Sequence, residues 1–363
     1  FWVLHTRVRE RVRGALVRFP TQSGRTMQFQ ATTRSARAKS VRVLLEMGSN
    51  FFKQTPLVMK FKFFLLALSG LAVITALLLA LDRPLITTSA AEEASLSVAR
   101  LQDTLPPPLL GAHAFISALI RTDGQVEVLT EKNAHQRWPI ASITKLFTAS
   151  IALEKYKLSE AVVLEEEDLP ETFDSGLFRV GESFRVDDLL KALLLQSSNN
   201  AAVTLSRFDN NQAQFMAEMN DLAQKLELAD TRFFNPNGLD PGVGETGANY
   251  SSVYDLTLFA KWLIKNQPGI LALTKTPNAT IRQANGDFHH EAHSTNEILI
   301  TEPWSSDILG GKTGFTELAG KNLLLVLRAP DNQGYLVNIV LGSPDHFLEM
   351  RKLVSWVLGA YRF

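Results

Sequence analysis

Apolar and polar residues alternate in two short runs between positions 113 and 138, and the turn-forming residues 122–124 separate the runs. Alternation with a period of two is typical of a strand with one buried face, so this segment predicts a β-hairpin. Four later segments place apolar residues three and four positions apart, which predicts amphipathic helices. These helices are expected at residues 142–156, from 187 to just before 197, at 212–228 and at 252–266.

Strand-like runs return in the last third of the chain. They lie at residues 279–284, 287–294, 321–329 and 335–343, and a helical pattern follows at 346–361. Residues 231–242, in contrast, are rich in turn-forming residues and predict a loop. Strands at both ends of a domain with helices between them indicate an α/β (α+β) fold, in which helices flank a central, mainly antiparallel sheet.

A run of 19 residues without charge, Phe63–Leu81, precedes this domain. As a helix it would be about 28 Å long, close to the hydrocarbon thickness of a bilayer. Lys60 and Lys62 stand before the run and small residues follow it at 88–91, as in a signal peptide or a membrane anchor. Residues 59–81 are therefore expected to export the rest of the chain, either as a cleaved signal or as an uncleaved transmembrane helix.

The charges are unevenly distributed along the chain. Residues 1–58 form an Arg-rich leader with 11 basic and 2 acidic side chains, whereas the rest of the chain has 26 basic and 35 acidic ones. The leader is expected to be unstructured; it resembles a transit peptide in composition, but we favour a start of translation at Met59. Residues 82–110 contain consecutive prolines and are expected to be a linker to a domain at 111–363. The acidic balance of that domain argues against nucleic-acid binding.

Two observations bear on metals and disulfides. The chain contains no cysteine, which excludes disulfide bonds and cysteine-ligated metals. His289, His290 and His293 lie close together, but their surroundings predict strand or loop and offer no evident partner carboxylate. We therefore expect no metal site.

Ser142 and Lys145 are one helical turn apart in a segment whose other residues are mostly apolar. Side chains at positions i and i+3 lie on the same side of a helix. A lysine that loses water on burial has a lowered pKa and can take the proton of a neighbouring hydroxyl. The pair therefore predicts a serine nucleophile with a lysine base, although a surface serine beside an extended lysine is the plainer alternative.

Two other segments contain polar residues suited to a binding site. Residues 197–202, Ser-Ser-Asn-Asn-Ala-Ala, are by themselves most simply a polar helix-capping turn. Residues 310–316 contain Lys312-Thr313-Gly314, which on a strand edge would present an ammonium group and a hydroxyl side by side. Such a pair suits a carboxylate, although a plain turn between strands has the same composition.

The order Ser-x-x-Lys, Ser-x-Asn, Lys-Thr-Gly is the signature of penicillin-binding proteins and class A β-lactamases. The chain resembles that superfamily from about residue 110 to 363, and most closely the D-alanyl-D-alanine carboxypeptidases among the low-molecular-weight penicillin-binding proteins. Residues 233–240, 249–263 and 310–324 are also similar to stretches typical of that family. The resemblance implies a β-lactamase/transpeptidase-like domain.

The resemblance also implies catalytic roles for four residues. Ser142 would be the nucleophile and Lys145 its general base, while Ser197 would relay a proton and Asn199 would hydrogen-bond the substrate backbone. The doubled Ser-Ser-Asn-Asn also permits Ser198 with Asn200, but only the first pair places Ala201 where the family has a small residue. The family usually has an acidic residue at the position of Asn200.

Substrate binding is implied for the third motif. Lys312 and Thr313 would hold the terminal carboxylate of D-Ala-D-Ala, and Gly314 would let the backbone approach closely. The backbone N–H of Phe315 would join that of Ser142 as an oxyanion hole. The chain ends 51 residues after Lys312, which leaves room for two strands and a helix but not for the second domain of many relatives.

These implied roles predict a cofactor-independent serine-type D-Ala-D-Ala carboxypeptidase that trims peptidoglycan stem peptides in the bacterial cell envelope, with β-lactams as covalent inhibitors. A D,D-endopeptidase that cuts cross-links with the same residues is the first alternative. A β-lactamase and a non-catalytic protein that binds muropeptides or penicillin are the others. Residues 231–242 contain no glutamate, which disfavours the deacylation mechanism of class A β-lactamases.

Overall fold

The structure of the protein is a computed structural model that describes residues 17–20, 26–29, 99–100, 106–169, 177–242 and 247–363. The chain divides into two units, Phe1–Ser95 and Leu96–Phe363. The described part of the first unit is an antiparallel hairpin of β1 (Val17–Pro20) and β2 (Thr26–Phe29). The expected signal or anchor segment, Phe63–Leu81, lies outside the described residues. Within the part that the structure describes, no helix has the length and apolarity to cross a membrane.

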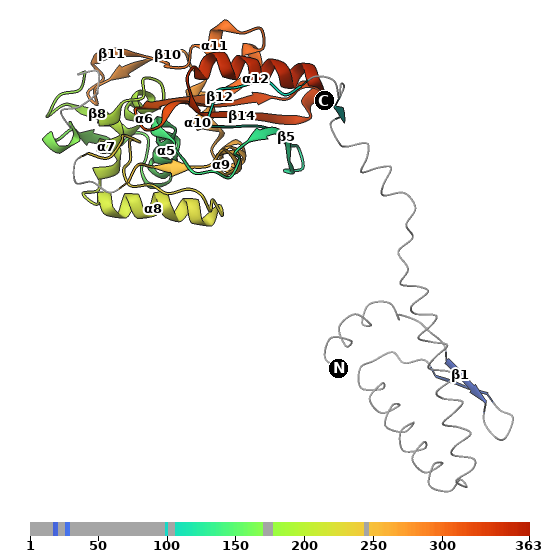
Figure 1. Cartoon of the computed structure of the whole chain (residues 1–363). Coiled ribbons are helices and arrows are strands. Elements are labelled where there is room, and N and C mark those ends of the chain that lie inside the picture. Colours follow the sequence, from blue (N-terminus) through green and yellow to red (C-terminus); the bar gives the residue numbers. More distant parts are fainter. Residues whose placement is uncertain (1–16, 21–25, 30–98, 101–105, 170–176, 243–246) are drawn as a thin grey trace. The chain divides into compact units, whose positions relative to one another are not determined.

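A five-stranded sheet forms the centre of the second unit (Figure 1). Its strand order is β12 (Ile308–Thr316), β13 (Gly320–Arg328), β14 (Gly334–Ser343), β4 (Ala114–Arg121) and β5 (Val126–Lys132). Every neighbouring pair is antiparallel, which confirms the expected central sheet. The predicted N-terminal hairpin is β4–β5, and it joins the C-terminal strands through the pairing of β4 with β14. The strand with the Lys-Thr-Gly motif, β12, is at one edge.

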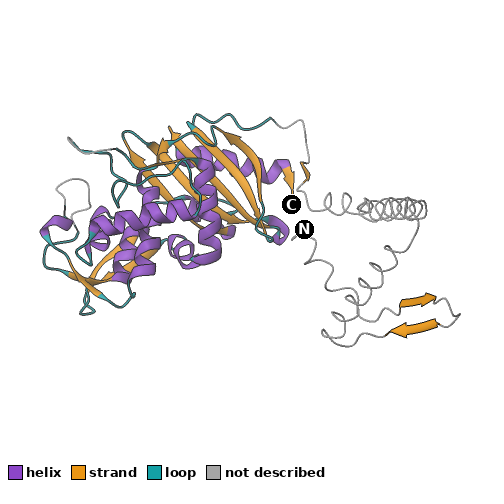
Figure 2. Cartoon of the chain, turned by 90° about the horizontal axis from the view of Figure 1, so that it is seen from below, coloured by secondary structure: helices purple, strands orange, loops and turns teal. Residues whose placement is uncertain are grey.

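Helices cover both faces of this sheet, as Figure 2 shows in purple. Alternate residues of the central strands point to opposite sides: in β4, Ile116 belongs to one apolar cluster and Phe115 to the other. The smaller cluster includes α12 (His346–Ala360), whereas the larger one includes α5 (Thr144–Lys155) and α9 (Val253–Asn266). Burial on both faces explains why β4, β13 and β14 are almost continuously apolar.

The predicted helices are present with small shifts of their ends. The first of them is divided into a 3-10 turn, η1 (Ala141–Ile143), and α5, so Ser142 lies in the turn that leads into the α-helix. The others are α6 (Val186–Leu194), α8 (Gln212–Lys225), α9 and α12. Three helices have no counterpart in the sequence prediction: α7 (Asn199–Arg207), α10 (Pro268–Thr274) and α11 (Ile298–Thr301).

Short strands pair outside the central sheet. The predicted strands after residue 278 form an antiparallel hairpin of β10 (Asn278–Arg282) and β11 (Phe288–His293). The other pairs are β6 (Trp138–Pro139) with β9 (Tyr250–Ser251), β7 (Ala161–Val163) with β8 (Ser183–Arg185), and β3 (Ala99–Arg100) with β15 (Tyr361–Arg362). The remaining 3-10 turns are η2 (Glu166–Asp168), η3 (Ser305–Asp307) and η4 (Pro330–Asn332).

Candidate active site

Ser142 is partly exposed at a strained turn ahead of α5. The residue before it, Ala141, has φ of 48°, a left-handed conformation that is uncommon for a residue with a side chain. Strained backbone of this kind occurs preferentially at functional sites. The edge strand β12 passes directly beside this turn, since a Cβ atom on Gly314 would lie 3.0 Å from the backbone N of Ser142. Glycine at position 314 therefore permits the close approach of the Lys-Thr-Gly strand to the serine.

Lys145 is fully buried one turn further along α5. Its Nζ donates to Ser142 Oγ at 2.8 Å, to Asn199 Oδ1 at 2.8 Å and to the carbonyl oxygen of Asn237 at 2.7 Å. An ammonium group has three N–H donors, and these bonds use all three of them on uncharged oxygen atoms. Loss of water on burial disfavours the charged form of a lysine, whereas hydrogen bonds donated to oxygen atoms favour it. The geometry therefore places an amine that can exchange a proton with a hydroxyl in hydrogen-bond contact with Ser142.

The two serines of the Ser-Ser-Asn-Asn segment make different hydrogen bonds. Ser198 is the N-cap of α7, and its hydroxyl accepts from the backbone N–H of Ala201 at 3.1 Å. Ser197 is the residue before the cap, and its Oγ accepts from Lys312 Nζ at 2.9 Å. Asn199, the first residue of α7, accepts from Lys145. The geometry thus brings Ser197 to Lys312 and Asn199 to Lys145.

Lys312 is buried on β12 and 1% exposed. Besides Ser197, its Nζ contacts the carbonyl oxygen of Thr313 at 3.1 Å. Burial lowers the pKa of the Lys312 ammonium group to about 7, because loss of water disfavours its charge. The hydroxyl of Thr313 lies 2.5 Å from that of Thr295, a residue that the sequence did not single out. Lys312 and Thr313 therefore present an ammonium and a hydroxyl group together on the strand beside Ser142.

Phe315 follows Gly314 on the same strand, and its side chain is 58% exposed. Because Gly314 packs against the backbone of Ser142, the backbone of Phe315 is close to the start of the serine turn. The expected oxyanion-hole residues are thus on two adjoining segments, η1 and β12.

The loop at 231–242 links the first and third motifs, although its side chains were not predicted to do so. Gly238 lies against the strained serine turn, since a Cβ atom there would be 2.0 Å from the carbonyl oxygen of Ala141. Asp240 accepts from Thr316 Oγ1 at 2.6 Å and from the backbone N–H of Leu318 at 3.0 Å. The loop therefore connects the start of α5 to the turn after the Lys-Thr-Gly strand.

Asn249 closes the same loop from the other side. Its amide group donates to Thr144 Oγ1 at 3.1 Å and to the carbonyl oxygen of Asn235 at 2.8 Å, while its amide oxygen accepts from the N–H of Phe234 at 2.6 Å. Asn237, Asp240 and Asn249 are therefore structural residues of the site that sequence reasoning did not identify. The density of asparagine and glycine between 235 and 249 was the available signal, because asparagine side chains often bond the backbone in turns.

The described residues do not include a group of three or more His, Cys, Asp or Glu side chains that could hold a metal ion. The Nδ1 atoms of His289 and His290 lie 2.6 Å apart, within hydrogen-bond distance of each other. The arrangement around Ser142 is instead suited to acyl transfer, which needs a nucleophile, a base and hydrogen-bond donors but no metal.

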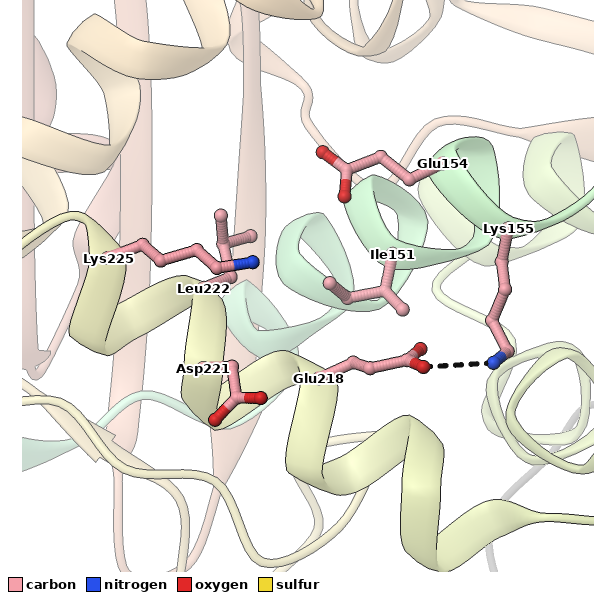
Figure 3. A pocket seen from close by; sticks show the side chains of 7 residues that line it. All are labelled: Ile151, Glu154, Lys155, Glu218, Asp221, Leu222 and Lys225. Atoms are coloured by element: carbon pink, nitrogen blue, oxygen red, sulfur yellow. Dashed lines mark hydrogen bonds and ion pairs between the residues drawn. The ribbon is translucent and has the colours of Figure 1, made fainter.

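A separate pocket of about 290 Å³ lies between α5 and α8 (Figure 3). Charged side chains surround a floor of Ile151 and Leu222, and Lys155 forms an ion pair of 3.0 Å with Glu218 at one end. None of the motif residues lines this pocket. It is on the part of α5 that follows Lys145 by two turns, so it is distinct from the candidate active site.

Comparison with known proteins agrees with this geometry. Residues 107–345 match the family model described as D-alanyl-D-alanine carboxypeptidase. A D-alanyl-D-alanine endopeptidase of Pseudomonas aeruginosa is 31% identical over 278 residues, which are 72% of this chain and 85% of that protein. The D-alanyl-D-alanine carboxypeptidase DacD of Salmonella typhimurium is 32% identical over 269 residues. Those residues are 69% of this chain but only 63% of DacD, so the chain spans less than two thirds of that relative.

A solved structure supports the same assignment. Penicillin-binding protein D2 of Listeria monocytogenes, in its cefotaxime-bound form, has a TM-score of 0.59 and 30% identity to this chain. The match covers 70% of this chain and 100% of that one. The order of motifs, the antiparallel sheet and the family match over residues 107–345 together confirm the resemblance seen in the sequence: the chain belongs to the D-alanyl-D-alanine carboxypeptidase family of penicillin-binding serine hydrolases.

Proposed function

We propose that this chain is a serine-type D-Ala-D-Ala carboxypeptidase that removes the terminal D-Ala from peptidoglycan stem peptides through an acyl-serine intermediate. The main supporting observation is the set of bonds from the two buried lysines. Lys145 contacts both Ser142 and Asn199, and Lys312 contacts Ser197, so residues from all three motifs lie within hydrogen-bond distance of one another. Family membership supports the same reaction.

In the first half-reaction, Ser142 Oγ attacks the carbonyl carbon of the penultimate D-Ala. Lys145 Nζ in its neutral form takes the hydroxyl proton as the new C–O bond forms. The N–H groups of Ser142 and Phe315 stabilise the negative charge that develops on the carbonyl oxygen. The C–N bond then breaks, the proton that Lys145 took passes through the Ser197 hydroxyl to the leaving amine, and D-Ala departs with Lys145 neutral again.

In the second half-reaction, water attacks the acyl ester. The attacking water loses a proton to Lys145, and Ser142 Oγ recovers one when the C–O bond to the enzyme breaks. The product is the shortened stem peptide with a new carboxylate. Every proton moves between groups that this chain or water supplies, so the reaction requires no cofactor.

Lys312 and Thr313 bind the terminal carboxylate of the substrate. The pKa of Lys312 is about 7 in the structure without ligand, and a bound carboxylate would raise it, because an opposite charge at short range favours the ammonium form. The Thr313 hydroxyl adds a second donor. The carboxylate of a β-lactam fits the same pair, and we propose β-lactams as covalent inhibitors that acylate Ser142.

A second candidate is a D,D-endopeptidase that cuts peptidoglycan cross-links with the same residues. The favouring observation is similarity: the D-alanyl-D-alanine endopeptidases of P. aeruginosa and Escherichia coli are 31% and 30% identical to this chain. Incubation with a pentapeptide and with a cross-linked dimer, followed by mass spectrometry of released D-Ala and of separated monomers, distinguishes the two. We expect D-Ala from the pentapeptide; cleavage of the dimer alone would favour the endopeptidase, and cleavage of neither, with an intact wild-type fold, would overturn both.

We further propose that the chain works in the bacterial cell envelope. The apolar segment Phe63–Leu81, with Lys60 and Lys62 before it, supports export as a signal peptide or as a membrane anchor. Peptidoglycan lies outside the cytoplasmic membrane, so the proposed substrate requires this location. Fractionation of the native host with an antibody against the peptidase domain tests the proposal, and N-terminal analysis of the mature protein shows whether the segment remains attached.

A further inference from the structure

Ser197 has a strained backbone conformation. Its φ of 64° is in the left-handed region, which a serine adopts rarely and at an energetic cost. Two backbone bonds hold the residues around it: Ser198 N–H donates to Ala192 at 3.1 Å, and Thr295 N–H donates to Leu195 at 3.1 Å. Neither bond involves Ser197 itself, so its conformation depends on what holds its neighbours.

The side chain of Gln196 provides another anchor for this turn. Its Oε1 lies 3.0 Å from Nε2 of His290, which is on β11. Figure 1 shows the β10–β11 hairpin on the same side of the domain as α6 and β8, in agreement with a bridge between Phe184 and Gln283. His290 therefore connects the Ser197 turn to a hairpin that lies outside the three motifs.

His290 is itself held by a chain of contacts. Its Nδ1 lies 2.6 Å from Nδ1 of His289, and Nε2 of His289 lies 3.3 Å from a carboxylate oxygen of Glu182. The rings of Phe178 and Phe184 pack on His289, at centroid distances of 5.6 Å and 5.0 Å. The side chains of His289 and Glu182 are only 11% and 17% exposed, so these contacts are largely shielded from water.

The neighbours of the two histidines bear on which ring nitrogens donate. The amide oxygen of Gln196 and the carboxylate of Glu182 can only accept, so each histidine donates from its Nε2. The two Nδ1 atoms at 2.6 Å can share one proton but cannot both hold one. Toward the site, His290 donates to the amide oxygen of Gln196.

We propose that His290 is a positioning residue for acylation, which acts through Gln196 to keep Ser197 in its strained conformation beside Lys312. His289 and Glu182 set the tautomer and the orientation of its ring. The inference rests on the proposed function, because it assigns the Ser197 hydroxyl a part in the reaction. A small displacement of a reacting group such as this hydroxyl lowers the reaction rate much more than it lowers the affinity for the substrate.

The test compares variants of the whole chain in their reaction with a fluorescent penicillin. His290→Phe keeps a ring and removes the donor, His290→Gln restores a donor, and His293→Phe is the matched control on an exposed position of the same strand. We expect the acylation rate constant of His290→Phe to fall by about 10–100-fold, whereas His290→Gln should recover most of the rate and His293→Phe should match the wild type. The fraction of molecules finally acylated should stay at the wild-type level.

That final fraction separates positioning from a general loss of structure. Unfolding would lower the fraction acylated and leave the rate of the remaining molecules unchanged. Gln196→Met removes the acceptor, and its effect should not add to that of His290→Phe if both act through one bond. Additive effects, a wild-type rate in His290→Phe, or a lower acylated fraction at wild-type rate would each overturn the inference. Failure of the wild-type chain to be acylated would instead overturn the proposed function.

Discussion

Lys145 and Lys312 donate to the same three-residue segment, Lys145 to Asn199 and Lys312 to Ser197. Between these two residues, Ser198 caps α7 and fixes the segment at the start of a helix. Both lysines are buried, and these bonds replace part of the water that each has lost. The segment therefore links the proposed base to the proposed carboxylate site, and a change in one is expected to affect the other.

The first prediction concerns the nucleophile and its base. A labelled penicillin should modify the wild-type chain at one position only, because Ser142 belongs to the single Ser-x-x-Lys in the sequence. Ser142→Ala should prevent labelling, and Lys145→Ala should slow it by about 10²–10⁴-fold, the usual contribution of a general base. Lys155→Ala, at the far end of the same helix, is the control and should label normally. Labelling that persists in Ser142→Ala would assign the nucleophile elsewhere.

The second prediction concerns Lys312 and pH. Burial lowers the pKa of its ammonium group to about 7, so in the free enzyme it is charged below pH 7 and neutral above. Only the charged form attracts a carboxylate. The ratio of kcat/KM for a free-acid peptide to that for its C-terminal amide should therefore fall as pH rises from 6 to 9, by at most about tenfold per pH unit.

Variants of Lys312 test the cause of that pH dependence. Lys312→Ala should reduce kcat/KM for the free acid by about 10–100-fold, which corresponds to the loss of a charge-assisted hydrogen bond, and should affect the amide much less. It should also remove the pH dependence of the ratio. Equal losses for the free acid and the amide would mean that Lys312 supports the reaction or the fold and not carboxylate binding.

The third prediction concerns the contact between the 231–242 loop and the serine turn. Gly238 has φ of +81°, and an added Cβ atom would lie 2.0 Å from the carbonyl oxygen of Ala141. Gly238→Ala should lower the free energy of unfolding by about 2–5 kcal/mol and slow acylation, because Ala141 precedes the nucleophile. Chemical denaturation measures the first effect and penicillin labelling the second.

Substitutions of two other glycines distinguish the cost of backbone strain from the cost of a steric clash. Gly181 has φ of +84°, but among the described residues no heavy atom lies within 4 Å of an added Cβ, so Gly181→Ala should cost only about 1–2 kcal/mol of strain. Gly269 is in α10 and also has open space around it, so Gly269→Ala should be neutral or stabilising by up to about 1 kcal/mol. If Gly238→Ala lowers the free energy of unfolding no more than Gly181→Ala does, the predicted clash between the added Cβ atom and Ala141 does not occur.

The site could be predicted in outline because its side chains occur in three motifs with fixed local spacing. Ser142 and Lys145 are one turn apart on one face, so their contact follows from helix geometry alone. Lys312 and Thr313 adjoin each other on a strand. The sequence also predicted the hairpin β4–β5, because its strands are adjacent in the chain and the turn between them contains glycine.

The remaining contacts depend on tertiary packing that no local pattern specifies. The third acceptor of Lys145 is the backbone carbonyl of Asn237, an atom that every residue possesses. Thr295 lies beside Thr313 because the segment after β11 runs along the turn before α7. The helix α7 was not predicted because its first residues are polar and suit a turn as well as they suit a capped helix.

The last prediction distinguishes a peptidase from a β-lactamase. Both form an acyl-serine, and a class A β-lactamase hydrolyses it with a water that a glutamate activates. The 231–242 loop lies against the serine turn and contains no glutamate. Asp240 is its one acidic residue. That carboxylate already accepts from Thr316 and Leu318, so it holds the loop to β12 and is not directed at a water near Ser142.

Penicillin should consequently remain attached to Ser142. Without a positioned carboxylate base, deacylation should be slower by about 10²–10⁴-fold than with one. Intact-mass spectra should show an adduct of one penicillin that persists for minutes or longer after removal of free drug. Asp240→Asn should not lengthen the life of the adduct by the roughly 10²–10⁴-fold expected for loss of a base that activates water. Rapid multiple-turnover hydrolysis of a chromogenic cephalosporin by the wild-type chain would instead identify a β-lactamase, since it requires an efficient route for water to the ester.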